Sequence, residues 1–218
     1  MDRHKDFVDL AKKGGIDVLF LGDSITDYWR SADKLKGGKA VWDAQFAPLH
    51  AANFGIGGDR TQHVLWRIEN GELDSLRPKA VVLLIGTNNT GYERDRPTIP
   101  RNATAETIAG ITAVVHRLKE KLPDARILLL AIFPRGQKND PIRNQVKEVN
   151  AGIAQLSDGR NVRFLDIGAR FLEPDGSLSA EVMPDLLHPS EKGYSIWAAA
   201  IKEPLNELLT SGAATARQ

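Results

Sequence analysis

The sequence predicts an α/β protein, a three-layer α/β/α sandwich built around one five-stranded parallel sheet. Five apolar runs of strand length recur along the chain, and segments with apolar residues at helical spacing lie between them. Two of the runs are unbroken stretches of Val, Leu, Ile and Ala, which is typical of strands covered on both faces. Alternating strands and helices indicate parallel strands joined by right-handed crossovers.

The expected strands cover residues 16–21, 50–54, 80–85, 126–133 and 162–167. The third and fourth of these are the continuous apolar runs, so we expect them near the centre of the sheet.

Two helices are predicted from apolar residues that recur every three or four positions. The first carries Ile108, Ile111, Val114, Val115, Leu118 and Leu122, and the second carries Tyr194, Trp197, Ala198, Ile201, Leu205 and Leu208. We assign Thr104 as N-cap and Pro123 as the stop of the first, and Ser190 as N-cap and Pro204 as a kink of the second.

Length and composition favour one domain with a nearly neutral surface. The 218 residues suit a single domain, 1–218, with its core at about 15–210 and a flexible tail at 211–218. Because 29 Lys and Arg residues balance 28 Asp and Glu residues, we expect no nucleic-acid partner, and a small, nearly neutral substrate fits better.

The absence of Cys excludes disulfides, thiolate metal sites and cysteine nucleophiles. No window approaches the apolar length of a membrane span, and the charged N-terminus lacks the apolar stretch of a signal peptide. We therefore expect a soluble protein, cytoplasmic as written, and secreted or periplasmic only if a leader was removed.

Functional residues are expected just after the strands, because ligands of open parallel sheets bind outside the carboxyl ends of the strands. Ser24 directly follows the first run and opens a helix, where backbone N–H groups and a partial positive charge would stabilise an oxyanion. A simple capping role for Ser24 is the alternative.

Two further candidates follow the second and third runs. The glycine-rich turn around Gly58 can direct backbone N–H groups into a site, and Asn88 offers an amide donor at the same edge of the sheet. Both also fit ordinary turns. The turn lacks the Lys of a P-loop and the glycine spacing of a dinucleotide-binding loop.

Asp185 precedes His188 by three residues on a loop before the last helix. An Asp that accepts a hydrogen bond from one ring nitrogen fixes the tautomer and leaves the other nitrogen free to take a serine proton. Because no two His residues share a helical metal-binding spacing and Cys is absent, we expect no metal and no cofactor.

Four ordered blocks of the sequence resemble the signature of the GDSL or SGNH hydrolase family. They are Gly22-Asp23-Ser24, Gly57-Gly58-Asp59, Gly86-Thr87-Asn88 and Asp185-Leu186-Leu187-His188. Within this family, residues 46–89 are especially similar to the catalytic subunits of the platelet-activating-factor acetylhydrolase Ib type.

The resemblance implies a flavodoxin-like sandwich and a role for each of these residues. Ser24 would be the nucleophile, the Ser24 and Gly58 N–H groups with the Asn88 side chain the oxyanion-hole donors, and His188 the base, oriented by Asp185. The implied substrate is a small acyl ester, and a homodimer is the implied assembly. The segment 90–102 is longer than in the acetylhydrolase relatives, and we interpret it as a lid, an interface segment or a solvated insertion.

The predicted activity is hydrolysis of short-chain acyl esters, chiefly acetyl esters, through an acyl-enzyme. A carbohydrate O-acetyl esterase is the main alternative, followed by a lysophospholipase or thioesterase. A metal-dependent hydrolase ranks behind these enzymes. Outside the enzymes, the alternative is a silent flavodoxin-like binding module whose glycines only make turns.

Overall fold

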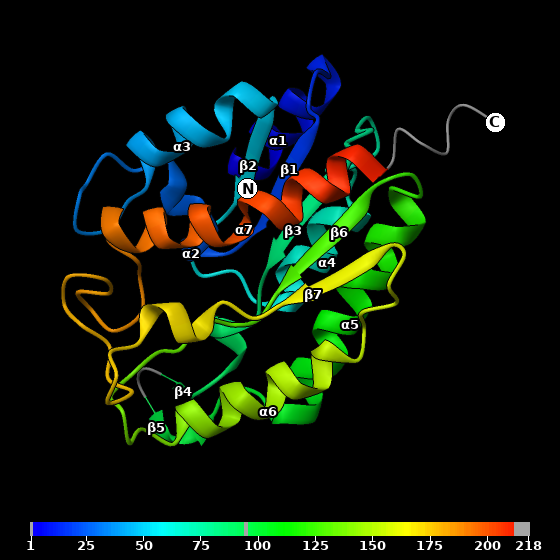
Figure 1. The fold of residues 1–218 in the computed structure, drawn as a ribbon. Coiled ribbons are helices and arrows are strands. Elements are labelled where there is room, and N and C mark those ends of the chain that lie inside the picture. Colours follow the sequence, from blue (N-terminus) through cyan, green and yellow to red (C-terminus); the bar gives the residue numbers. More distant parts are fainter. Residues whose placement is uncertain (1, 94–95, 212–218) are drawn as a thin grey trace.

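Five parallel strands form the central sheet, as expected. They are β1 (Val18–Gly22), β2 (Ala51–Gly55), β3 (Ala80–Leu84), β6 (Arg126–Leu130) and β7 (Val162–Leu165). The computed structural model describes residues 2–93 and 96–211, and gives the strand order β2-β1-β3-β6-β7 (Figure 1). This is the flavodoxin-like order, in which the chain changes direction across the sheet between β1 and β3. All five predicted strands are confirmed, with ends that differ by a few residues.

Helices cover both faces of the sheet, which confirms the three-layer sandwich (Figure 1). One face carries α1 (Asp2–Lys13), α4 (Thr61–Glu69), α5 (Thr104–Lys121) and α6 (Ile142–Ala154). The other carries α3 (Lys39–Gln45) and α7 (Glu191–Ser211). Short helical turns complete the connections: α2 (Ser24–Asp27), η1 (Tyr28–Arg30), η2 (Ala47–Leu49), η3 (Thr87–Asn89) and η4 (Gly168–Phe171).

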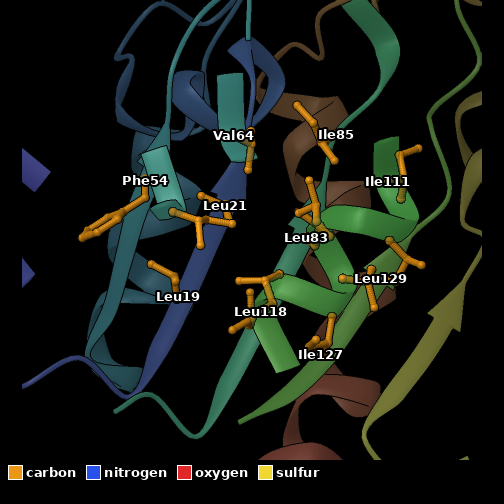
Figure 2. Close-up of a cluster of buried hydrophobic side chains, with 14 of the residues drawn as sticks. Leu19, Leu21, Phe54, Val64, Leu83, Ile85, Ile111, Leu118, Ile127 and Leu129 are labelled. Carbon is orange, nitrogen blue, oxygen red and sulfur yellow. The ribbon is translucent and has the colours of Figure 1, made fainter. Parts of the chain in front are cut away.

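The apolar strands fill two cores because alternate side chains point to opposite faces. Leu19, Leu21, Leu83 and Leu129 pack under α4 and α5 (Figure 2). The intervening residues of the same strands face α7, where Trp29, Tyr194 and Trp197 form an aromatic cluster with ring centroids 4.3–5.9 Å apart. The continuous runs in the sequence therefore reflect burial on both sides.

We expected the folded core to begin at about residue 15, but buried residues already occur in α1. Phe7 and Ala11 of α1 are buried in the first core, and Phe7 stacks on Phe54 at 4.5 Å between ring centroids. Most other side chains of α1 are charged, so its narrow apolar stripe gives a weak signal in the sequence. The helices α3 and α6 were also not predicted. At the C-terminal end α7 extends to Ser211, and the rest of the expected tail, 212–218, lies outside the described residues.

One of the two predicted helix caps is wrong by one residue. The N-cap of α5 is Ala103, whose backbone N–H donates to Glu106 at 3.0 Å, while Thr104 instead bonds Glu148 at 3.1 Å. Ser190 is confirmed as a cap, because its Oγ accepts from the Gly193 N–H at 3.3 Å. Pro204 lies inside α7, which continues beyond it.

The segment 90–102 contains a small antiparallel pair, β4 (Tyr92–Glu93) and β5 (Arg96–Pro100), at the edge of the sandwich (Figure 1). Residues 94 and 95 lie outside the described residues. A lid or interface role for this segment stays a prediction. Across the described helices, none has both the length and the apolar character required to cross a bilayer.

Candidate active site

Ser24, His188 and Asp185 meet above the carboxyl end of β1. The Ser24 Oγ lies 2.9 Å from His188 Nε2, and His188 Nδ1 lies 2.8 Å from Asp185 Oδ2. The two contacts use opposite nitrogens of one imidazole ring. Since a carboxylate can only accept, Nδ1 carries the proton and Nε2 presents its lone pair to the serine hydroxyl.

Asp185 is held in its charged form by several donors. Its Oδ1 accepts from the backbone N–H groups of Leu187 at 3.1 Å and His188 at 2.7 Å, and Lys36 Nζ lies 3.0 Å from Oδ2. Partial burial acts to raise the pKa of Asp185, but the hydrogen bonds from His188 and Lys36 outweigh it and keep that pKa well below its usual value. The carboxylate therefore stays ionised beside the imidazole.

The loop that carries this pair is fixed by an unusual backbone conformation. Leu186 has a φ of 60°, in the left-handed region that residues other than glycine rarely adopt. Its carbonyl accepts from the Gly136 N–H at 2.8 Å, which ties the loop to the segment after β6. This bend turns Asp185 and His188 toward each other.

Ser24 sits where β1 passes into α2 with little space for side chains. A Cβ on Gly22 would lie 2.3 Å from the Leu84 carbonyl oxygen, so only glycine fits this crossing of strand and helix. Asp23 is the N-cap of α2, since its Oδ1 accepts from the Ile25 N–H at 3.0 Å. Ser24 thus occupies the first helical position, where backbone N–H groups have no partner within the helix.

The turn after β2 brings Gly57, the residue before Gly58, beside the serine. A Cβ on Gly57 would lie 3.9 Å from Ser24 Cβ, and the Gly57 N–H donates to Asp27 Oδ2 at 3.2 Å. Gly58 has a φ of 84° and is exposed. No hydrogen bond within the described residues uses the Gly58 N–H, which leaves it available to a ligand.

The two adjacent asparagines after β3 differ in environment. Asn88 is partly exposed, and its Nδ2 donates one hydrogen bond, to the Asp59 carbonyl at 2.9 Å. Asn89 is buried, and its Oδ1 accepts from the N–H of Thr61, the first residue of α4. Among the described residues the second N–H of the Asn88 amide has no partner and is available to a ligand, whereas Asn89 accepts a hydrogen bond from the first N–H of α4.

The second oxygen of Asp23 is a buried polar atom without a hydrogen-bond partner in the described residues. Burial raises the pKa of Asp23 to about 7, against the hydrogen bond from Ile25 that acts to lower it. The carboxyl next to Ser24 therefore titrates near neutral pH.

Several supporting residues were not predicted from the sequence. Lys36 contacts Asp185, Asn53 Nδ2 donates to the Thr26 carbonyl at 2.8 Å, and Arg135 Nη1 donates to the Thr87 carbonyl at 2.7 Å. The only signal was the position of Arg135 just after the fourth predicted strand, whereas Asn53 lies within β2. In the part of the chain that the structure describes, no three His, Asp or Glu side chains gather in a way that would hold a metal ion.

The sequence profile described as the GDSL-like Lipase/Acylhydrolase family matches residues 20–196. The chain belongs to this family. It is a carboxylic ester hydrolase, as the GDSL-like family and its acetylhydrolase relatives indicate.

Curated GDSL-like relatives match almost the whole chain. Platelet-activating factor acetylhydrolase IB subunit alpha1 of Bos taurus is 41% identical over 212 residues, which cover 96% of this chain and 84% of that protein. Subunit alpha2 of Rattus norvegicus is 39% identical over 210 residues, covering 96% and 82%.

Solved structures of GDSL-like proteins share the fold. A GDSL-like lipase from Bacteroides thetaiotaomicron superposes with a TM-score of 0.71 at 18% identity, covering 94% of this chain and 97% of that one. A mutant of an acetyl-xylooligosaccharide esterase from Geobacillus stearothermophilus gives a TM-score of 0.66 at 25% identity, covering 89% and 94%.

Proposed function

We propose that this protein is a serine esterase that hydrolyses short-chain acyl esters, chiefly acetyl esters, with Ser24 as nucleophile, His188 as base and Asp185 as its orienting partner. The observation that carries the proposal is the 2.9 Å contact between Ser24 Oγ and His188 Nε2. A serine that only capped α2 would have no need of an imidazole held by a carboxylate.

The reaction proceeds by acyl transfer in two halves. His188 Nε2 takes the Ser24 proton as Oγ attacks the ester carbonyl carbon, and the imidazolium then protonates the departing alkoxide, leaving an acyl-serine. In the second half His188 takes a proton from water, the hydroxide attacks the acyl-serine, and the proton returns to Ser24 as the carboxylic acid leaves, to ionise in solvent. Asp185 stabilises the imidazolium in both halves.

The negative charge that develops on the carbonyl oxygen is balanced by three donors. We assign these to the backbone N–H groups of Ser24 and Gly58 and to the Asn88 amide. The free Gly58 N–H, the position of Ser24 at the start of α2 and the remaining Asn88 hydrogen support the assignment.

The preference for acetyl is supported by the names of the relatives. The acetylhydrolase subunits are about 40% identical to this chain over most of its length, and the acetyl-xylooligosaccharide esterase shares its fold. Hydrolysis of acetylated carbohydrates is a second candidate function, favoured by that structural likeness. Because these relatives are named as subunits, we also propose that this chain assembles with a second copy of itself, to be tested by the mass of the protein in solution.

The test is a panel of acyl esters from acetyl to long chain, assayed beside acetylated oligosaccharides, with wild-type protein and Ser24→Ala. We expect the fastest turnover on acetyl esters and a loss of several orders of magnitude in Ser24→Ala. An organophosphonate should label the wild type at Ser24 and leave the variant unlabelled. Near wild-type turnover by Ser24→Ala would contradict the proposed nucleophile.

A further inference from the structure

A buried ion cluster lies directly behind the Gly58 turn and takes no part in the reaction described above. It consists of Asp59, Arg67 and Glu72, which are 8%, 3% and 0% exposed. Arg67 Nη1 lies 2.5 Å from Glu72 Oε1 and also donates to the Phe54 carbonyl at 3.1 Å. Arg67 Nη2 lies 2.9 Å from Asp59 Oδ2, an ion pair that lacks the alignment of a hydrogen bond.

The cluster is also anchored to α1. His4 of α1 lies 3.2 Å from Glu72 Oε2, and the Arg67 guanidinium lies 6.0 Å from the centroid of the Phe7 ring. Contacts with Glu72, with the Phe54 carbonyl of β2 and with Phe7 of α1 therefore restrain the position of the Arg67 guanidinium.

Asp59 connects the Arg67 guanidinium to two of the three proposed oxyanion donors. Its backbone follows Gly58 directly, and its carbonyl accepts the hydrogen bond from Asn88 Nδ2 at 2.9 Å. One residue thus contacts Arg67 through its side chain and Asn88 through its backbone, and its position sets where the Gly58 N–H points.

The Gly58 position itself is exposed. A Cβ added to Gly58 would meet no atom within 4 Å, so nothing packs against the turn at this point. The backbone of the turn is also held by hydrogen bonds from the Ile56 N–H to the Gly22 carbonyl, from the Gly57 N–H to Asp27 Oδ2 and from the Asp59 N–H to the Ile56 carbonyl, each at 3.2 Å. Arg67 adds a buried charge 2.9 Å from the Asp59 carboxylate, which restrains the side chain at the end of this turn.

Stability alone gives a weak reason to keep these charges buried. Charged groups taken from water lose hydration, and well-packed apolar residues often replace a buried ion pair without loss. Burial raises the pKa of Asp59, and the Arg67 charge opposes this. Arg67 therefore favours the ionised side chain that it tethers.

We propose that the Asp59–Arg67–Glu72 cluster positions the oxyanion hole, with Asp59 as the positioning residue that holds the Gly58 N–H and the Asn88 amide in register with Ser24. The inference rests on the proposed function, because it assumes that these donors stabilise the transition state. A displacement of the donors by a fraction of an ångström weakens transition-state binding more than ground-state binding.

The test is a double-mutant cycle between Asp59→Asn and Asn88→Ala, assayed on an activated acetyl ester. Asp59→Asn keeps the shape and the backbone carbonyl but removes the charge that Arg67 holds. We expect kcat to fall by about ten- to a hundredfold with KM nearly unchanged, a part of the effect of losing an oxyanion donor outright. In the Asn88→Ala background, Asp59→Asn should lower kcat by less than about threefold, because one of the two donors that Asp59 positions, the Asn88 amide, is already absent.

The matched control is Arg117→Gln, which removes an arginine that joins α5 to Glu69 of α4 at 2.9 Å on the surface. It should leave kcat and KM unchanged. Melting temperatures of all variants separate misplacement of the donors from loss of the fold. If Asp59→Asn does not fold, Glu72→Gln tests the cluster from its far end, with a smaller fall in kcat that is again non-additive with Asn88→Ala.

Wild-type kcat in Asp59→Asn, or losses that multiply fully in the double variant, would overturn the inference while Ser24→Ala remains inactive. Activity retained by Ser24→Ala would instead refute the proposed function. The two failures therefore give different results.

Discussion

At the level of single residues, Asn88 and Asn89 carry the same amide on adjacent positions but face different partners. Within residues 2–93 and 96–211, one N–H of the Asn88 amide has no partner, whereas Asn89 is buried and accepts from the first N–H of α4. The same substitution should therefore have different consequences at the two positions.

We expect Asn88→Ala to lower kcat by about a hundred- to a thousandfold with little change in melting temperature, because it removes a transition-state donor. Asn89→Ala should lower stability by about 1 kcal/mol or more, because it leaves a buried helix N–H without an acceptor. Steady-state kinetics and urea unfolding of both variants provide the check. Equal kinetic losses in the two variants would contradict the assignment of Asn88.

Asp23 should make stability depend on pH. Its pKa is raised from 3.8 to about 7 by burial, so between these values the folded protein keeps a proton that the unfolded chain has lost. Wild-type stability should therefore decline as pH rises through this window and level off above about 7.

Asp23→Asn removes this titration. The stability of the variant relative to wild type should rise with pH by at most about 1.4 kcal/mol per pH unit within the window. Urea unfolding between about pH 4 and pH 8 measures the difference, with the exposed Asp124→Asn as control. A stability difference that does not change with pH would contradict the buried proton.

At the level of secondary-structure elements, α1 is part of the fold although most of its residues are charged. Its Phe7 is buried against Phe54 and lies under the guanidinium groups of Arg30 and Arg67, 5.5 and 6.0 Å from the ring centroid. Phe7→Ala should destabilise the protein by about 3 kcal/mol, as expected for a large-to-small change in a core.

The matched change on the same helix is Leu10→Ala, whose side chain is 38% exposed. It should cost less than about 1 kcal/mol. Urea unfolding of both variants tests whether α1 belongs to the core, and equal small losses would show that it does not.

The contrast between β3 and α1 explains how much of the fold the sequence could predict. Ala80–Leu84 is apolar throughout because both faces are covered, and such a run is visible without knowledge of its neighbours. In contrast, α1 buries only a narrow stripe of side chains, and Phe7 is one of few apolar residues in a segment whose composition is typical of a solvent-exposed surface. Thr104 was taken for a cap because of its type, whereas Glu106 supplies the cap interaction from inside the helix.

The sequence predicts those residues of the candidate site that lie in short, recognisable blocks. Ser24, Gly58, Asn88 and the Asp185–His188 pair each follow a strand or open a helix, and parallel topology brings strand ends together. Lys36 and Arg67 could not be predicted, because their contacts with Asp185 and Asp59 depend on how distant loops and helices pack. A charged residue in a helix or loop looks the same in the sequence whether it is solvated or buried.

At the level of the whole molecule, one sheet separates two apolar cores that share the same strands. Ile111 of α5 lies in one core and Ile201 of α7 in the other, and both are fully buried. Ile→Val at each position should cost about 1 kcal/mol. Since the two sites share no partners, the losses should add to within about 0.5 kcal/mol.

Urea unfolding of the two single variants and the double variant tests this additivity. A single cooperative transition is expected in all three, because β1, β3 and β6 contribute side chains to both cores. Two separate transitions would indicate that the cores unfold independently.

The serine and the histidine that contact each other are 164 positions apart in the chain. Under the proposed mechanism, a ribosome must therefore synthesise the chain beyond His188 before the nascent protein can cleave an ester. The same mechanism predicts that fragments ending before His188 are inert toward substrate even when their strands have formed, and that turnover during refolding begins when the loop that carries His188 docks.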